Sequence, residues 1–193
     1  MIEGASFLPD YEIRRLCEER EPPMIEPFVP VQAGKPTYGL SSVGYDIRLG
    51  RKILVPKFSG INLILDPRRF PKEMFTVVEL KEDEETFEIA PHSSILAESI
   101  EYFHMPDDVF AICTGKSTYA RCGIFLNFTV AEPGWKGRLT LEISNLSSYP
   151  VRLYIGHGIG QMLFFKTPRP KRTYPQKEAG GLYQHQEGVT LPR

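Results

Sequence analysis

Ionisable and hydroxyl-bearing side chains are concentrated between residues 113 and 145, among runs of apolar residues. The densest cluster consists of Lys116, Ser117, Thr118 and Arg121. Two cations and two hydroxyl groups at this spacing suit a polyanion such as a chain of phosphates, because all of them donate hydrogen bonds to phosphate oxygens. The same residues would also make a polar turn with two exposed charges, and the spacing leaves both interpretations open.

A carboxylate that could transfer protons follows in the run from residue 138 to residue 144. Strict alternation of apolar and polar residues predicts a β-strand with one apolar and one polar face. The apolar positions are Leu139, Leu141 and Ile143, and the polar ones are Arg138, Thr140, Glu142 and Ser144. By periodicity alone, Glu142 is a surface glutamate.

Several known catalytic motifs do not fit the chain. The run TGKS at 114–117 matches the end of a phosphate-binding loop, but that loop needs a glycine where this chain has Phe110. His185 and Glu187 have the spacing of a zinc deaminase motif, but only six residues follow Glu187 and none is cysteine. The chain also lacks the H-x-H pair of a metal cupin and the G-x-S-x-G of a serine hydrolase. These motifs therefore give no support for a zinc site or a serine nucleophile.

Composition and charge limit the possible partners of the chain. With 23 Lys and Arg against 24 Asp and Glu in 193 residues, the net charge is −1, so the sequence indicates neither nucleic-acid nor membrane binding. No run approaches the roughly 18 apolar residues of a membrane span. Three cysteines without C-x-x-C spacing predict neither disulfides nor a cysteine zinc site. We expect a cytoplasmic protein.

The arrangement of apolar runs predicts an all-β fold in one domain over residues 1–193. A short helix is expected from Pro9-Asp10 to a point before Pro22-Pro23, because apolar residues recur there at helical spacing. Short runs separated by turn residues then predict an antiparallel sandwich or barrel. The predicted strands cover residues 52–55, 75–80, 86–89, 94–100, 109–113, 124–130, 138–144, 151–154 and 161–165. Residues 168–193 contain few apolar side chains, so we expect an extended tail.

Longer motifs give this chain a resemblance to the bacterial dCTP deaminases. The matching segments lie in the same order along most of the chain, and together they are far more specific than one short motif. They are SSVGYDIR at 41–48, IEYF at 100–103, KSTYARCG at 116–123, EPGWKG at 132–137, LTLEISN at 139–145, GQMLFF at 160–165 and YQHQEGVTLP at 183–192.

The resemblance implies a fold, an assembly and a reaction. The expected fold is the distorted jelly-roll β-barrel of the dUTPase-like type, with a short N-terminal helix. The expected assembly is a homotrimer whose active sites are shared between subunits, with a tail at about 168–193 closing over the nucleotide. The implied reaction is hydrolytic deamination of dCTP to dUTP and ammonia, with Mg²⁺ on the triphosphate and no zinc. The resemblance also makes dTTP a candidate inhibitor.

Matching the motifs residue by residue assigns roles within the expected site. The resemblance implies that Glu142 is the proton shuttle, that Arg121 limits the rise in the pKa of its carboxyl group, and that Ser117 helps to hold the water. Backbone groups near Thr129 and Val130 are further anchors. The implied substrate-binding residues are Lys116, Ser117, Thr118, Tyr119, Ala120, Arg121, Thr140, Leu141, Glu142, Gln161, Tyr174 and Gln186.

The chain departs from the family pattern in the tail and in one turn. Leu182 replaces a phosphate-facing lysine of the tail, which makes Lys177 and Arg172 the alternative phosphate contacts. His157 stands in an altered turn, where we expect a turn residue and not a catalytic one.

Two alternative functions stay open. Glu132 occupies the place of the dUTPase aspartate, so a bifunctional enzyme that releases dUMP and diphosphate is one alternative. The other is a noncatalytic nucleotide-binding trimer.

Overall fold

A computed structural model describes residues 6–57, 65–177 and 180–193 of the chain. The two α-helices are α1 (Asp10–Glu18) and α2 (Ser117–Ala120), and short 3-10 turns cover Lys72–Met74 and Tyr174–Gln176. The first strands are β1 (Ser6–Phe7), β2 (Ile25–Glu26), β3 (Gly39–Leu40), β4 (Tyr45–Pro56), β5 (Phe75–Glu79), β6 (Thr86–Ile89) and β7 (Ser94–His104). The others are β8 (Val109–Gly115), β9 (Ile124–Leu126), β10 (Thr129–Ala131), β11 (Lys136–Asn145), β12 (Val151–Tyr154) and β13 (Gly158–Lys166).

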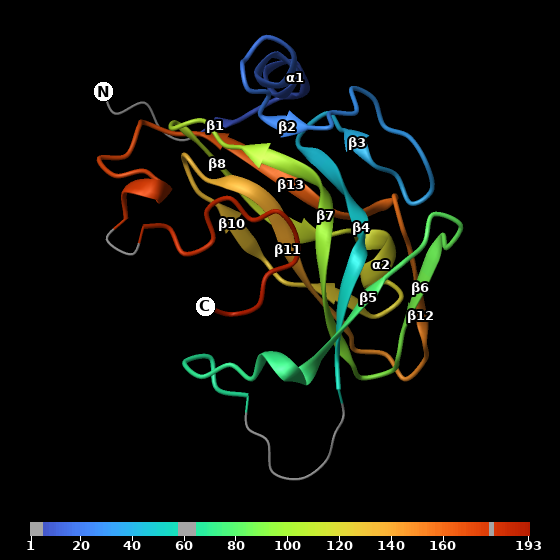
Figure 1. The fold of residues 1–193 in the computed structure, drawn as a ribbon. Helices are drawn as coiled ribbons and strands as arrows, with labels where there is room; N and C mark the ends of the chain where they lie inside the picture. The colour runs from blue at the N-terminus through green and yellow to red at the C-terminus, as the bar shows by residue number, and fades with distance from the viewer. Residues whose placement is uncertain (1–5, 58–64, 178–179) are drawn as a thin grey trace.

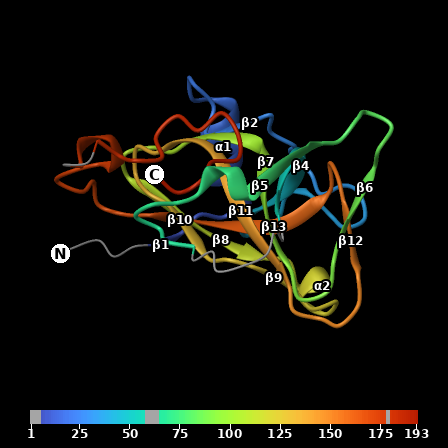
Figure 2. The same cartoon turned by 60° about the horizontal axis from the view of Figure 1, so that its bottom comes forward.

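The strands form one long antiparallel sheet and a separate two-stranded sheet. The order along the main path is β10-β8-β13-β4-β7-β11-β9, and β1, β2, β3 and β5 pair at its sides. The main sheet curls into a half-barrel, while β6 and β12 project from it as an antiparallel pair (Figures 1 and 2). The all-β barrel-type fold that the sequence predicted is therefore confirmed.

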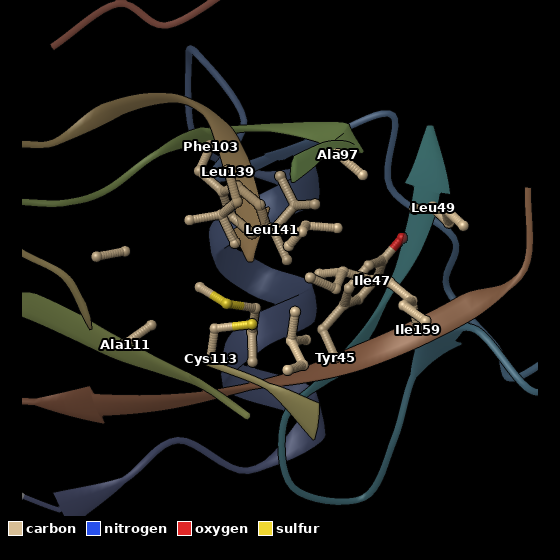
Figure 3. Close-up of a cluster of buried hydrophobic side chains, with 14 of the residues drawn as sticks. Tyr45, Ile47, Leu49, Ala97, Phe103, Ala111, Cys113, Leu139, Leu141 and Ile159 are labelled. Carbon is tan, nitrogen blue, oxygen red and sulfur yellow. The ribbon is translucent and has the colours of Figure 1, made fainter. Parts of the chain in front are cut away.

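The interior of the half-barrel holds the apolar face of each long strand. Along β11 buried and half-buried residues alternate without a break, so its leucines and Ile143 face inward and its polar residues face the other way. Figure 3 shows Tyr45, Phe103 and Leu141 in this cluster, whose labelled side chains belong to β4, β7, β8, β11 and β13. Burying each of these large side chains stabilises the fold by roughly 1.5–3 kcal/mol, so this cluster anchors the strands that carry the polar residues.

Helix α1 packs against the edge of the barrel by a narrow apolar stripe. Ile13 and Cys17, one turn apart, are its buried residues. Asp10 and Glu12 lie in the first turn, where negative charge is favourable to the helix dipole. The helix ends at Glu18, ahead of the two prolines, which confirms the predicted short N-terminal helix.

Several elements differ from the predicted ones: β1, β2 and β3 were not predicted, and β4 begins at Tyr45, ahead of the strand expected over 52–55. The single strand expected over 124–130 is divided into β9, which pairs with β11, and β10, which pairs with β8. Asn127 and Phe128 lie between them, and the Asn127 N–H donates to the carbonyl of Glu142 over 3.1 Å. The one-turn helix α2 was not predicted, because four residues carry too little periodicity to be recognised.

The tail returns along β11 of its own chain. The carbonyl of Gln186 accepts the N–H of Arg138 at 2.8 Å, and the N–H of His185 donates to the Lys136 carbonyl at 2.8 Å. In Figure 1 the red C-terminal segment crosses beside β10 and β11. Within the described residues, no helix has both the length and the apolar character needed to span a bilayer.

Candidate functional site

The polar face of β11 forms one wall of a cavity of about 370 Å³. The other walls come from β7, β10, the segment that leads into β5, and the tail. Its lining combines a few polar groups with many apolar side chains, as is typical of sites for small organic ligands. The lining residues are Leu65, Phe70, Phe75, Leu96, Thr129, Val130, Trp135, Leu139, Thr140, Glu142, Tyr174, Tyr183, Gln186, Thr190 and Pro192.

Glu142 is the carboxylate in this cavity, and it is half-buried instead of fully exposed. Burial raises the pKa of its carboxyl group, and hydrogen bonds from its own backbone N–H and from the Asn127 side chain oppose part of that rise. Its Oε2 atom is buried without a hydrogen-bond partner among the described residues. An unsatisfied buried carboxylate oxygen in a cavity is positioned to accept a proton from a bound water or ligand.

Tyr174 and Gln186 reach the same cavity from the tail segment. The Tyr174 hydroxyl accepts the N–H of Tyr183 at 3.1 Å, and the Gln186 side-chain amide donates to the Arg138 carbonyl at 3.1 Å. Both residues, together with Thr140, therefore line the cavity that contains Glu142. Thr129 and Val130 line it from β10. The structure brings together these sequence-predicted positions, although tail and strand are far apart in the sequence.

The residues around α2 do not line this cavity in the single chain. Ser117, Thr118 and Ala120 are exposed, and so is Arg121, whose guanidinium donates to the Ser117 carbonyl at 3.1 Å. Their side chains thus face away from the core at a different part of the surface from Glu142. Within one chain, the predicted site is divided into two groups of residues.

Lys116 is mostly buried, and its ammonium group lies in an ion pair. Its Nζ lies 2.5 Å from Oδ2 of Asp46, and the two side chains are 12% and 3% exposed. The same carboxylate accepts hydrogen bonds from Gln32 at 3.0 Å and Thr37 at 3.2 Å. In the free chain, the ammonium group is therefore directed toward the barrel and fixes the residue that precedes α2.

Three other predicted contacts also have structural positions. Tyr119 is buried, and its hydroxyl accepts the N–H of Tyr154 at 3.0 Å. Leu141 is 1% exposed and faces the core, so only its backbone could meet a ligand at the polar face. Gln161 is half-buried on β13, opposite Thr114 of β8, and does not line the cavity with Glu142.

Trp135 is a cavity residue that the sequence analysis did not select. Its indole N–H donates to the carbonyl of Tyr183 at 2.9 Å, which ties the tail to the cavity wall. Phe70 and Phe75 are further wall residues, with ring centroids 5.7 Å apart. The EPGWKG segment was the only available signal for Trp135, and no local periodicity could have placed the two phenylalanines there.

Residues with alternative roles are held in ion pairs or turns. The Nζ atom of Lys177 lies 2.5 Å from Oε1 of Glu132. Lys177, the predicted phosphate contact in place of the missing tail lysine, is therefore paired with the glutamate that occupies the place of the dUTPase aspartate. His157 lies in the turn between β12 and β13, as predicted, with Nδ1 3.0 Å from the Ile155 carbonyl. His185 belongs to the extended tail and not to a helix. In the described part of the chain, no three His, Cys, Asp or Glu residues group together as metal ligands.

The chain is similar to known proteins over nearly its full length. A family model described as dCTP deaminase-like matches residues 7–167. A dCTP deaminase of Campylobacter jejuni is 47% identical over 188 residues, covering 95% of this chain and 96% of the relative. One from Xanthomonas campestris is 44% identical over 196 residues, covering 97% and 99%.

A solved structure is similar in fold as well. The crystal structure of 2'-deoxycytidine 5'-triphosphate deaminase from Agrobacterium tumefaciens has a TM-score of 0.62 and 19% identity over 85% of this chain. The match covers 49% of that longer chain, so this chain spans about half of its length. At this identity the similarity supports the shared barrel fold. On the evidence of the family model and of relatives 44% and 47% identical, this chain belongs to the dCTP deaminase family.

Proposed function

We propose that this chain hydrolyses dCTP to dUTP and ammonia, with Glu142 as the proton shuttle. The Glu142 carboxylate takes a proton from a bound water while the water oxygen bonds to C4 of cytosine. The proton passes to N3, and the second proton of the water goes to the amine. The C4–N bond then breaks and ammonia leaves. Atoms balance with water as the only co-reactant.

The observation that supports this proposal most directly is the state of the Glu142 carboxylate. It lies in the cavity with one buried oxygen free of partners in the described residues, and burial raises its pKa. A carboxylate whose pKa is shifted toward neutrality can both accept and return a proton at working pH. General acid–base catalysis of this kind contributes on the order of 10²–10⁴ in rate.

We further propose that a homotrimer completes the site, with Ser117 and Arg121 coming from a second copy. Both residues are exposed and lie outside the cavity of their own chain. An exposed apolar surface that a neighbouring copy could cover includes Phe125, Phe128, Val130 and Leu146, which are 43%, 63%, 56% and 66% exposed. Val130 also lines the cavity, so this surface reaches the edge of the proposed site.

Mg²⁺ belongs in this proposal as part of the substrate complex, bound to the triphosphate. We propose no role for zinc, and we expect dTTP to compete with dCTP for the same cavity.

The state of the cysteines agrees with the proposed location of the protein. The thiols of Cys17, Cys113 and Cys122 are free, which suits the reducing cytoplasm expected for the chain.

A product analysis tests the reaction. The protein is incubated with dCTP and Mg²⁺, and the nucleotides and ammonia are separated and measured. Equal amounts of dUTP and ammonia support the proposal. Release of dUMP and diphosphate would instead assign the bifunctional reaction, and unchanged dCTP would leave a nucleotide-binding protein. The pairing of Glu132 with Lys177 favours the first result, because that carboxylate is already engaged.

The shuttle itself is tested by Glu142→Gln. The amide keeps the shape of the side chain but cannot carry the proton, so we expect turnover to fall by at least about 10²-fold while dCTP still binds. Folding should be preserved. Burial raises the pKa of the Glu142 carboxyl group, so the folded protein loses stability when pH rises and this group ionises. A glutamine side chain does not ionise and therefore avoids this loss. Near wild-type turnover would exclude Glu142 as the shuttle.

Mixing two inactive variants tests the shared site. Glu142→Gln and Arg121→Ala are unfolded together and refolded at equal amounts. If each site combines Glu142 of one copy with Arg121 of the next, random assembly makes about one quarter of the sites wild-type in both residues. If both residues acted within one chain, no activity would return.

A further inference from the structure

Glu98 lies on β7 directly opposite Thr140 of β11 in the register of the two strands. Both side chains meet the tail where it passes over the polar face of the sheet. The Thr140 hydroxyl accepts the N–H of Thr190 at 2.9 Å. The carboxylate of Glu98 lies against the tail just before this residue, because a Cβ on Gly188 would stand 2.5 Å from its Oε2 and the Val189 N–H lowers the pKa of the Glu98 carboxyl group. Two neighbouring side chains on the sheet therefore face two successive main-chain N–H groups of the tail.

The close fit of Glu98 depends on glycines on either side of it. A methyl group on Gly188 of the tail would stand 2.5 Å from Oε2 of Glu98. A methyl group on Gly50 of β4 would stand 2.6 Å from its Cγ. Such distances are too short for any carbon, so the carboxylate can reach the tail only because both positions lack a side chain.

Burial has the largest effect on Glu98 and raises the pKa of its carboxyl group. The backbone N–H groups of Val189 and Lys52 and the positive charges of Arg138 and Lys52 oppose part of that rise. The two backbone donors offset part of the cost of burying the carboxylate, and one of these donors belongs to the tail.

We propose that Glu98 and Thr140 form an acceptor pair that holds residues 188–192 of the tail over the cavity lined by Glu142. Glu98 does not line the cavity, whereas Thr140, Thr190 and Pro192 do. Glu98 is thus a positioning residue, which acts on the site through the tail. That the closed cavity is a deaminase site rests on the proposed function, but the fixing of the tail does not.

Hydrogen exchange of the unliganded protein tests the acceptor pair without relying on activity. In Glu98→Leu the side chain keeps a similar volume but offers no acceptor to Val189. Loss of a hydrogen bond to a charged group corresponds to roughly a tenfold to hundredfold change in an equilibrium constant. We therefore expect the amides of Val189 and Thr190 to exchange at least about tenfold faster, with no change at Ile143 in β11. Exchange within twofold of the wild type would overturn the proposal.

Three companion variants separate positioning from a general effect on folding. Glu98→Gln keeps an acceptor oxygen and should retain most of the protection. Gly188→Ala keeps Glu98 but places a methyl group against its carboxylate, and should accelerate exchange as Glu98→Leu does. This change lies in the tail and leaves the buried core untouched, so it remains a test if Glu98→Leu does not fold. The matched control is Glu88→Leu, which removes a carboxylate paired with Arg152 on the separate β6–β12 sheet. Its tail amides should exchange at the wild-type rate.

Steady-state kinetics provides the second readout. An open tail lowers the fraction of protein that is ready to bind, which raises the apparent dissociation constant but leaves the bound state unchanged. Any loss in Glu98→Leu should therefore appear as a higher KM for dCTP, with kcat within about threefold. A lower kcat at unchanged KM would overturn the positioning role. If wild-type protein fails to deaminate dCTP, the proposed function fails while the exchange result still decides the acceptor pair.

Discussion

Replacement of Lys116 by Met tests whether this lysine is a structural residue of the barrel. Its ammonium group lies 2.5 Å from Asp46, and the two side chains are only 12% and 3% exposed. Removing the cation leaves the buried carboxylate with Gln32 and Thr37 as its side-chain donors. Breaking a buried pair from one side costs about 3–5 kcal/mol, because an uncompensated charge remains. We expect Lys116→Met to lower the free energy of unfolding by this amount.

The chain supplies a matched control for this measurement. Lys166 pairs with Asp108 at the same distance of 2.5 Å, but those side chains are 48% and 40% exposed. Exposed ion pairs contribute about 0–1 kcal/mol, so Lys166→Met should change the free energy of unfolding by no more than that. The two lysine pairs therefore have the same N–O distance and differ in burial.

Urea denaturation followed by circular dichroism measures both variants at one fixed protein concentration, since assembly makes stability depend on concentration. Adding Asp46→Asn to Lys116→Met removes the orphaned charge and should recover a large part of the lost stability. If Lys116→Met were as stable as Lys166→Met, burial of the pair would not have the energetic effect reasoned here. Lys116 would then be better explained as a ligand-facing cation.

Glu142, the metal requirement and the barrel core lead to three more predictions. Because burial raises the pKa of Glu142 and the base must be ionised, kcat/KM should fall with decreasing pH through a pKa above the usual 4.5 of a glutamate; an acidic limb at or below 4.5 would contradict this. Chelation followed by addition of Mg²⁺ alone should restore full activity, whereas a requirement for stoichiometric zinc would exclude the metal-independent shuttle. Phe103→Ala should reduce the free energy of unfolding by about 3–5 kcal/mol in thermal or urea unfolding, because Phe103 is 0% exposed and its ring centroid lies 6.4 Å from that of Trp135. A loss below about 1 kcal/mol would show that this part of the core repacks freely.

The strands were largely predictable because their signal is local. Alternation along residues 138–144 predicted both the strand and the face that carries Glu142, and β6 and β12 have the predicted ends. The division of residues 124–130 between two strands was not predictable. At Asn127 and Phe128 the chain changes its pairing partner from β11 to β8. Hydrophobic periodicity does not show which distant strand a segment pairs with.

The sequence by itself determined the family and the all-β class, and it singled out Glu142 as the proposed acid–base residue, since each rests on residue types in fixed local order. Only the tertiary structure decided which polar groups meet. It placed Tyr174, Gln186 and Trp135 beside Glu142, and it turned Lys116 inward to an aspartate 70 residues away. The physical reason is that periodicity fixes the face on which a side chain lies. What covers that face depends on long-range packing of the whole chain.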